Sequence, residues 1–599
     1  MHEPTTILQP MARPDPKICS EQKLFARLHG RAHQSLSTGD VRFEIGAQVQ
    51  FDTYFNVFNI GKWTTHCGLK DIGLQLSGEG TIELTVCIVY ANQSPMRLID
   101  EIITLEPSNR LQIQVPLEGR TPHKGVLYFE FRGVSKGVLS DANWYTTQQP
   151  LRSPKLALSV TTFRREEAVR TTVNRFKEFV KTSRFGDQMH LFVVDNGKSA
   201  NIPVSEKVTP IENENYGGAG GFTRGLIEGM ERGFTHCLFM DDDASTLMDA
   251  VDRTWIFLAY ATEPKTAVAG AMITTSHIWA IWENGAEFDG VCRPLHGGTD
   301  LREPEQLFRM EHASTPRQSD KFYGGWWFFA FPLEHVEHLP FPFFVRGDDV
   351  SFSLVHDFNI TTLPGVVSFQ ESFTEKDSPL TWYLDLRSHL AHHLSLPNVD
   401  DGQNGLAVIA LWFWARTFLT CHYETMEAIN IAIEDVMRGP EYFADNADMA
   451  QRRADIGKLQ KKERWIPCAV PRERRYRKLN PDLWVTRWFM KLTLNGLLLP
   501  GFQYIGDHIV LPTSKRWRIR DHWGVASITY HDASEHKAYT VTHNKRRAIG
   551  VSLKTLKLIW TLRKRYPKLK KKWAEEYDRL TDRPYWDQTL GLSKSSEGP

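Results

Sequence analysis

Three consecutive acids, Asp241, Asp242 and Asp243, directly follow the apolar run CLFM. Neighbouring like charges repel, so a triplet at the end of a buried strand is costly unless something neutralises it. A divalent cation on a diphosphate would do so, and carboxylate oxygens suit magnesium or manganese. Since alternate strand residues share a side, we expect Asp241 and Asp243 to face one ligand and Asp242 to face away. A solvated acidic turn is the alternative.

A glycine-rich segment, ENENYGGAGGFTRG, precedes the acid triplet. Its glycines allow a ligand to approach the backbone closely, and a helix is expected to begin near Phe222. The free amides at such a helix start attract phosphate, so Gly217 and Gly218 are candidates for nucleotide contact. The spacing matches neither a P-loop nor the dinucleotide-binding fingerprint. A flexible loop is the alternative.

Two further groups of residues follow the triplet. In YGGWWFFAFP, Trp326 and Trp327 either form a platform for sugar rings or belong to the core of a strand. In RGDDVSFSL, Asp348 and Asp349 begin a helical pattern. They either cap that helix and complement its dipole, or one of them takes the proton from an attacking hydroxyl.

The elements that position these residues form an α/β pattern. The apolar runs in KLALSVTTF, MHLFVVDNG and HCLFMDDD each end in polar residues, and amphipathic stretches separate them. This is typical of a largely parallel sheet that binds ligands at the carboxyl ends of its strands. We predict three domains: a β-sandwich at 1–150, the α/β domain at 151–397 and a mainly helical domain at 398–599. The sandwich is either a structural brace or a carbohydrate-binding module.

Composition limits the classes of partner and compartment. The 599 residues include 72 Lys+Arg against 71 Asp+Glu, so no global charge attracts nucleic acid, and none is expected as a partner. Seven scattered cysteines with no C-x-x-C pair indicate reduced thiols, and the first residues lack the apolar core of a signal peptide. The apolar run at 405–415 is too short to span a bilayer. The prediction is a cytoplasmic protein.

A basic amphipathic stretch, LKTLKLIWTLRKRYPKLKKKW, lies near the end of the chain. It either contacts an anionic membrane surface, which would make the protein peripheral on the inner face of the cell membrane, or packs its apolar face on the domain.

Taken together, the motifs resemble a GT-A (Rossmann-like) glycosyltransferase, and more closely the polymerising galactofuranosyltransferases that build cell-wall galactan. The residues that carry the resemblance are VTTFRR, VVDNG, ENYGGAGGFTRG, FMDDDAS, GGWWFF, GDDVSF and LTDRPYWDQTLG, which cover nearly the whole length. The resemblance implies an inverting, metal-dependent transfer of galactofuranose from UDP-galactofuranose to a glycan acceptor that can be lipid-linked. It also favours a homo-oligomer.

The resemblance also implies roles for individual residues. Asp349 would be the catalytic base, with Asp348 helping to position the acceptor. The donor-binding residues would be Thr162, Arg164, Asp195, Gly217, Gly218, Asp241 and Asp242, the acceptor-binding ones Trp326, Trp327, Glu287 and Asp348, and the ligands of Mn²⁺ or Mg²⁺ Asp241, Asp243 and Gln370.

Three positions depart from the family pattern. Gly347 stands where the family has tryptophan, Gln370 where a third metal ligand, histidine, is expected, and Asp385 where the family has a further histidine. A glutamine oxygen is a weak neutral ligand, so the preference of this site among metal ions can differ from that of the family. The alternatives are a transferase using another UDP-sugar, a carbohydrate-binding or scaffold protein without turnover, and a nucleotidyltransferase.

Overall fold

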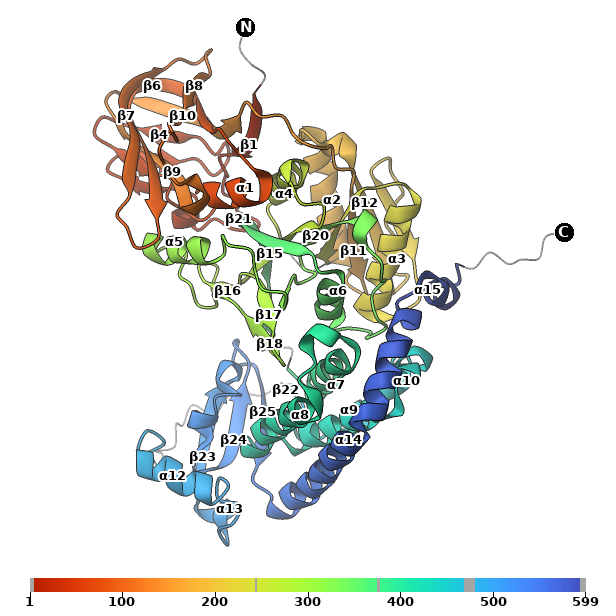
Figure 1. Cartoon of the computed structure of the whole chain (residues 1–599). Coiled ribbons are helices and arrows are strands. Elements are labelled where there is room, and N and C mark those ends of the chain that lie inside the picture. The colour runs from red at the N-terminus through yellow and green to blue at the C-terminus, as the bar shows by residue number, and fades with distance from the viewer. Residues whose placement is uncertain (1–4, 243–244, 374–376, 468–479, 593–599) are drawn as a thin grey trace, which may run out of the picture.

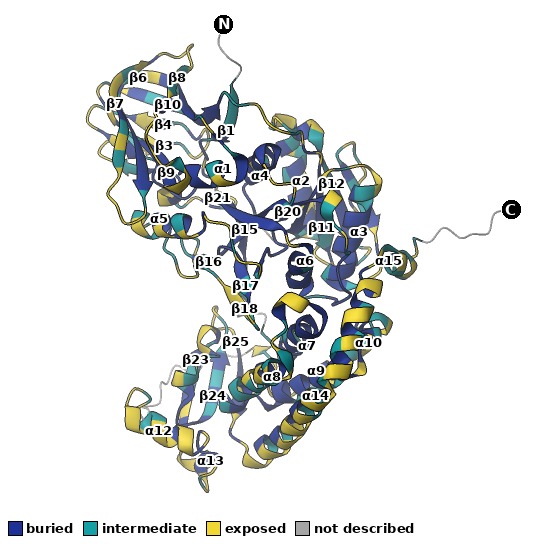
Figure 2. Cartoon of the chain, in the orientation of Figure 1, coloured by how far each residue is buried: buried dark blue, intermediate teal, exposed yellow. Residues whose placement is uncertain are grey.

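The computed structural model describes residues 5–242, 245–373, 377–467 and 480–592. Strands of the N-terminal region lie at one end of the molecule, an α/β region lies in the middle, and helices with a small sheet form the other end (Figure 1). In Figure 2 the strands of the middle region are almost entirely buried.

The N-terminal region is a ten-stranded antiparallel assembly built around β6, whose first half pairs with β8 and β10 and whose second half pairs with β7 and β9. The strand-and-turn pattern predicted there is therefore present, while the sandwich layout stays a prediction. The elements are β1 (Thr6–Pro10), β2 (Arg27–His29), β3 (Ala32–Gln34), β4 (Val41–Phe43), β5 (Gln48–Gln50), α1 (Ile60–Cys67), β6 (Gly73–Tyr90), β7 (Met96–Leu105), β8 (Leu111–Gln114), β9 (Gly125–Gly133) and β10 (Gly137–Thr146).

Helix α1 joins this region to the middle of the molecule. Trp63 stacks on Phe58 and meets Phe257 of the α/β region edge-on. Lys62 forms a buried ion pair with Glu311, with 3.0 Å between Nζ and Oε2. One apolar core runs through both regions. This continuity favours the brace over a separate carbohydrate-binding module.

The α/β region holds an eight-stranded sheet in the order β13-β12-β11-β14-β20-β15-β16, with β21 paired to β15. The predicted α/β class is confirmed, and β11 to β14 are parallel as expected. The strands are β11 (Leu156–Thr162), β12 (Met189–Asp195), β13 (Val208–Glu212), β14 (His236–Asp241), β15 (Thr266–Thr274), β16 (Ile281–Glu283), β20 (Phe329–Pro332) and β21 (Asn359–Gln370), with β17 (Ala286–Phe288), β18 (Cys292–Pro294) and β19 (Phe322–Tyr323) in a separate small sheet.

The helices of this region are α2 (Glu166–Thr182), α3 (Gly217–Glu231), α4 (Asp249–Tyr260), α5 (Pro304–Ala313) and α6 (Asp348–His356). Helix α3 begins at Gly217, so the expected start near Phe222 was wrong. Its glycines serve close packing: a Cβ on Gly221 would lie 2.1 Å from Thr161 Cγ2, and one on Gly225 would lie 2.0 Å from Ser159 Oγ. These glycines let α3 rest directly on β11.

The C-terminal region packs its helices around α14 and adds a four-stranded sheet that the sequence prediction missed. Helix α7, which precedes residue 398, packs with α9 and α14. The elements are α7 (Pro379–Ser395), α8 (Gly402–Leu419), α9 (Tyr423–Arg438), α10 (Pro440–Asp445), α11 (Ala450–Leu459), β22 (Ile466–Pro467), α12 (Trp484–Leu492), α13 (Phe502–Ile505), β23 (Asp507–Pro512), β24 (Val525–His531), β25 (Lys537–Thr542), α14 (Lys545–Leu580) and α15 (Arg583–Thr589).

Helix α15 returns the chain to the α/β region. Trp586 is fully buried in the apolar cluster that also holds Phe222 of α3, and its indole N–H donates to the Pro340 carbonyl at 2.9 Å. Arg583 pairs with Glu231 at the other end of α3. The last helix therefore packs along the helix that carries the glycine-rich motif.

Within the described part of the chain, no helix is long and apolar enough to cross a bilayer. The cysteines described there are unbridged, as predicted. Cys468 lies outside the described residues.

Candidate active site

A cleft of about 550 Å³ lies at the carboxyl edge of the sheet, between the α/β region and helices α7 and α8. Its walls bring together predicted site residues that are far apart in the sequence, namely Gly218, Asp241, Trp326, Trp327, Asp348 and Asp349. Residues predicted from separate motifs thus share one cavity.

The strand register sets the donor edge of this cleft. Thr161 lies opposite Asp241, and Thr162 lies opposite Asp195. The Thr162 hydroxyl donates to Asp242 Oδ2 at 2.6 Å, and Arg165 Nη1 lies 3.4 Å from Asp242 Oδ1. Asp241 lines the cleft, whereas Asp242 is buried and held by these groups. This matches the expectation that the two acids face opposite sides.

Asp195 shapes the loop after β12. Its carboxylate accepts hydrogen bonds from the backbone N–H groups of Gly197 at 2.9 Å and of Ser199 and Ala200 at 2.7 Å. Arg164 is exposed and has a positive φ of 54°. Neither side chain lines the cleft. Their nucleotide contacts stay predictions.

Asn196, which the sequence analysis did not single out, ties this loop to the glycine-rich helix start. Its side-chain amide donates to the Gly217 carbonyl at 2.9 Å and accepts from Asn213 at 2.9 Å. Gly217 itself has a φ of 67°, and a Cβ there would lie 2.1 Å from the Phe344 carbonyl oxygen. The first turn of α3 is therefore fixed close to the segment that precedes Asp348.

The acid pair begins α6, where Asp348 is buried and Asp349 is partly exposed in the cleft. Asp349 Oδ1 accepts the N–H of Val350 at 2.9 Å. Burial raises the pKa of Asp349 to about 6, against the lowering by backbone N–H groups at the helix start and by Arg346. Burial, and then the charge of Asp349, raise the pKa of Asp348 well above its ordinary value. Asp348 therefore holds its proton more tightly than an ordinary carboxyl, and Asp349, with the pKa of about 6, is the candidate base of the pair.

Two of the three positions that depart from the family pattern, Gly347 and Asp385, lie beside this pair. A Cβ on Gly347 would lie 2.5 Å from Ser388 Cβ and 2.9 Å from His392 Nε2, so the position has no room for a side chain. Arg346 Nη1 instead donates to both carboxylate oxygens of Asp385, at 2.8 and 2.9 Å. An ion pair thus joins α7 to the residue before Gly347.

The tryptophan pair forms a wall rather than an exposed platform. Trp326 packs edge-on against Phe222, Phe239 and Phe352. Its buried indole N–H has no hydrogen-bond partner among the described residues, so it is available to a ligand oxygen. Trp327 donates to the Gly270 carbonyl at 2.9 Å. Both are less than 10 % exposed, and both line the cleft.

Glu283 is a cleft residue that the sequence analysis missed. It ends β16, is 4 % exposed, and its Oε1 has no partner in the described structure. Burial, and then the charge of Asp349, raise its pKa to about 8. Glu287, the predicted acceptor contact, lies outside the cleft lining and accepts a hydrogen bond from Ser319 at 2.7 Å. Glu283 follows an apolar run, as Asp241 does. The same pattern, a strand that ends in an acid, could therefore have identified it.

Gln370, one of the proposed metal ligands, ends β21. Phe369 pairs with Ser245, just after the acid triplet, which holds Gln370 close to the segment carrying Asp241. Gln370 is buried and donates to Ser368 Oγ at 3.2 Å. Asp243 lies outside the described residues, and among those described no three Asp, Glu, His or Cys side chains group as metal ligands. The carboxylate of Asp241 and the amide oxygen of Gln370 are ligand types that suit a divalent cation.

Comparisons with known proteins bear on this arrangement. A family model described as galactofuranosyltransferase 2 N-terminal matches residues 23–147. The galactofuranosyltransferase GlfT2 of Mycolicibacterium smegmatis is 25 % identical over 463 residues, covering 72 % of this chain and 70 % of the relative. That of Mycobacterium tuberculosis is 26 % identical over 460 residues, covering 69 % and 68 %.

Two solved structures share part of the fold. GalNAc-T7, solved with UDP, GalNAc and Mn²⁺, is 8 % identical with a TM-score of 0.30 and covers 42 % of this chain and 49 % of its own. Mannosyl-3-phosphoglycerate synthase from Rubrobacter xylanophilus is 12 % identical with a TM-score of 0.28 and covers 41 % and 76 %. The sequence comparisons confirm the resemblance drawn from the motifs, and the chain is a glycosyltransferase related to the galactofuranosyltransferases.

Proposed function

We propose that this protein is an inverting, metal-dependent glycosyltransferase that transfers galactofuranose from UDP-galactofuranose to a glycan acceptor, on a core of the GT-A type. The observation that carries the proposal is the meeting of Asp241, the tryptophan pair and Asp349 in one cleft. The names of the two curated relatives support the choice of donor sugar.

The chemistry assigned to the chain centres on Asp349. An acceptor hydroxyl oxygen attacks the anomeric carbon, the bond from that carbon to the diphosphate oxygen breaks, and the diphosphate leaves with the bonding electrons. Asp349 takes the hydroxyl proton, and its pKa of about 6 suits a base near neutral pH. Asp348 forms a hydrogen bond with the acceptor and orients it. Attack from the face opposite the leaving group inverts the anomeric centre.

The donor side is assigned to the carboxyl edge of the sheet. Asp241 and Gln370, with Asp243, would hold Mn²⁺ or Mg²⁺, which when bound offsets negative charge on the diphosphate. The uridine contacts are assigned to Thr162 and Arg164.

Product analysis tests this function. Incubation with UDP-galactofuranose, manganese and short galactofuranosyl acceptors is expected to release UDP and lengthen the acceptor by galactofuranose. Extension with UDP-glucose or UDP-N-acetylglucosamine alone would reassign the donor. Absence of both UDP release and product with every donor would favour a carbohydrate-binding or scaffold protein instead.

We also propose peripheral membrane contact through α14. Its Leu562, Leu569 and Trp573 are buried in the helical bundle, while Leu553, Leu556 and Trp560 are exposed among lysines and arginines. The exposed stripe suits an anionic lipid surface. Deleting the helix would remove core residues, so the test is flotation of L553E/W560E with anionic liposomes. Flotation equal to that of the unchanged protein would contradict the contact.

A further inference from the structure

The half of the cleft that faces α7 and α8 is lined by aromatic residues that the proposed reaction does not use. They are Trp382 of α7, Trp412 and Phe413 of α8, and Trp517 from the segment between β23 and β24, and we call them the distal aromatic wall. We propose that this wall binds sugar rings of the acceptor beyond the one that reacts. The inference rests on the proposed function.

The rings of the wall form one connected surface. Trp382 lies 4.1 Å from Trp517 and 5.2 Å from Phe413, centroid to centroid, and Phe413 lies 5.1 Å from Trp412. Trp382 and Phe413 are buried beneath, whereas Trp517 is partly exposed and Trp412 is 37 % exposed. The two outer indoles therefore contribute surface to the cleft, and each also has an arginine over its ring, Arg516 at 4.7 Å from the Trp517 centre and Arg416 at 4.0 Å from the Trp412 centre.

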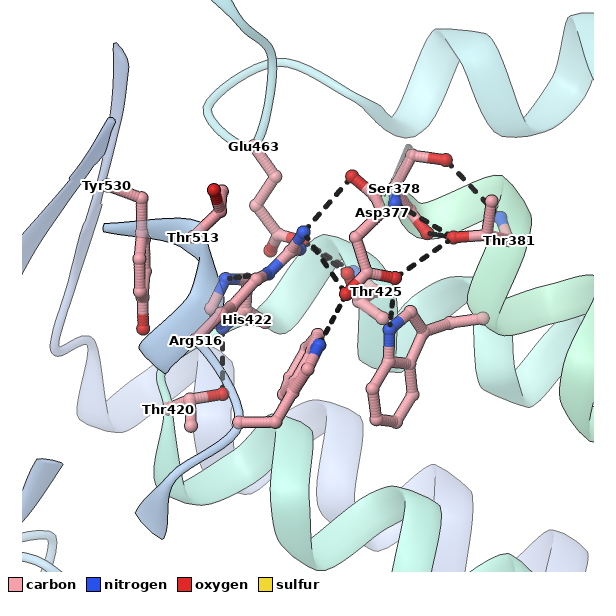
Figure 3. A network of polar contacts seen from close by, with 12 residues as sticks. Asp377, Ser378, Thr381, Thr420, His422, Thr425, Glu463, Thr513, Arg516 and Tyr530 are labelled. Atoms are coloured by element: carbon pink, nitrogen blue, oxygen red, sulfur yellow. Dashed lines mark hydrogen bonds and ion pairs between the residues drawn. The ribbon is translucent and has the colours of Figure 1, made fainter. Parts of the chain in front are cut away.

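A polar network fixes the indoles. The N–H groups of Trp382, at 3.2 Å, and of Trp517 both donate to the carboxylate of Asp377. Arg516 is 1 % exposed and holds Asp377 by donating to its carbonyl at 3.1 Å, and its Nε donates to His422 Nε2 at 3.1 Å (Figure 3). The polar edges of both indoles are thus satisfied inside the protein. What remains for a ligand at these residues is the flat apolar ring.

The groups around the wall indicate the class of ligand. The guanidinium of Arg416 lies 4.0 Å from the Trp412 ring centre, and the Arg346–Asp385 pair lines the same cleft. A sugar ring has an apolar C–H face for the indoles and hydroxyls for these charged groups. A hydrocarbon tail would instead desolvate the charges without replacing their hydrogen bonds.

The position of the wall also fits an extended acceptor. Asp349 lines the same continuous cleft as Trp412 and Trp517. An acceptor whose terminal hydroxyl lies at Asp349 therefore extends its preceding sugars along the rings. In this proposal a two-sugar acceptor ends before the wall and a longer one reaches it.

The test compares W412A and W517A with the unchanged protein, using UDP-galactofuranose and galactofuranosyl acceptors of two and six sugars. Loss of one stacking contact is expected to raise KM for the hexasaccharide about fivefold to tenfold. KM for the disaccharide and for the donor should stay unchanged. W484A is the matched control, because Trp484 is 69 % exposed and lies outside the cleft lining. W412F should retain most of the hexasaccharide affinity.

An equal rise in KM for both acceptors, or no rise for either, would overturn the wall as a subsite. If the unchanged protein transfers sugar to neither acceptor, the proposed function is refuted instead. In that case the wall is tested by binding alone, measured as the change in tryptophan fluorescence when the hexasaccharide is added. Binding that W412A weakens supports the wall, and absence of binding overturns it.

Discussion

The two ends of the cleft solve opposite physical problems. At the end proposed to react, Asp348 and Glu283 are buried, and the pKa values of Asp348, Asp349 and Glu283 are raised. One oxygen of Glu283 has no partner in the described structure. At the distal aromatic wall, the indole N–H groups of Trp382 and Trp517 are satisfied by Asp377. The carboxyl groups of the first end can change protonation when ligands bind. The rings of the second end keep a fixed geometry. Sensitivity to metal should therefore belong to the first end alone.

The largest effect is expected from Asp349→Asn. Transfer should fall by about 10²–10⁴-fold, because the amide cannot take the hydroxyl proton. UDP binding, measured by calorimetry with manganese, should stay close to that of the unchanged protein. Comparable losses of UDP binding and of transfer would contradict the role as base.

Asp241→Ala is expected to lower UDP affinity by about 10–100-fold in the presence of manganese, because a metal-binding carboxylate is lost. Without manganese the variant and the unchanged protein should bind UDP equally weakly. A variant that binds UDP as before with manganese would remove Asp241 from the metal site.

Arg516→Met probes the other end. It removes the Arg516 hydrogen bonds to the Asp377 carbonyl and to His422 Nε2, so the free energy of unfolding should fall by about 1–3 kcal/mol. The hexasaccharide KM should rise, while manganese-dependent UDP binding should not change. Arg520→Met is the control, because Arg520 is an exposed arginine paired with Asp482. Loss of UDP binding in R516M would show that the two ends are not separate.

Glu283→Gln is expected to change the pH dependence of stability. The folded-state pKa of about 8 lies above the ordinary 4.5, so the folded protein binds the proton more tightly and loses stability as pH rises between these values. The slope is at most about 1.4 kcal/mol per pH unit. Denaturant unfolding from pH 5 to 8 should show a shallower decline for E283Q. An unchanged slope would mean that Glu283 is not a buried acid.

The reacting end was largely predictable from sequence, because each of its signals is local. An apolar strand runs into Asp241, and a helical pattern starts at Asp348. The helix start at Gly217 was missed because the packing of its glycines on β11 depends on a strand sixty residues earlier in the chain. Alternation in VASITYH and KAYTVT does signal the C-terminal strands β24 and β25.

The distal end was not predictable for a different reason. The distal aromatic wall and the polar network behind it draw on residues from Asp377 to Trp517. No short motif specifies that Arg516 will reach Asp377 across that separation. The same holds for the pair between Arg346 and Asp385. Long-range pairing of this kind depends on the assembled fold.

The packing of α15 against the α/β region also affects the order in which parts of the protein fold during synthesis. Trp586 fills a cavity beside α3, and a Cβ on Gly220 would lie 3.6 Å from its ring. During synthesis the N-terminal strands and the sheet emerge first, yet the apolar cluster beneath the glycine-rich turn stays open until residues 583–589 have been made. Completion of this cluster should therefore follow folding of the sheet, because it requires α15 to pack beside α3.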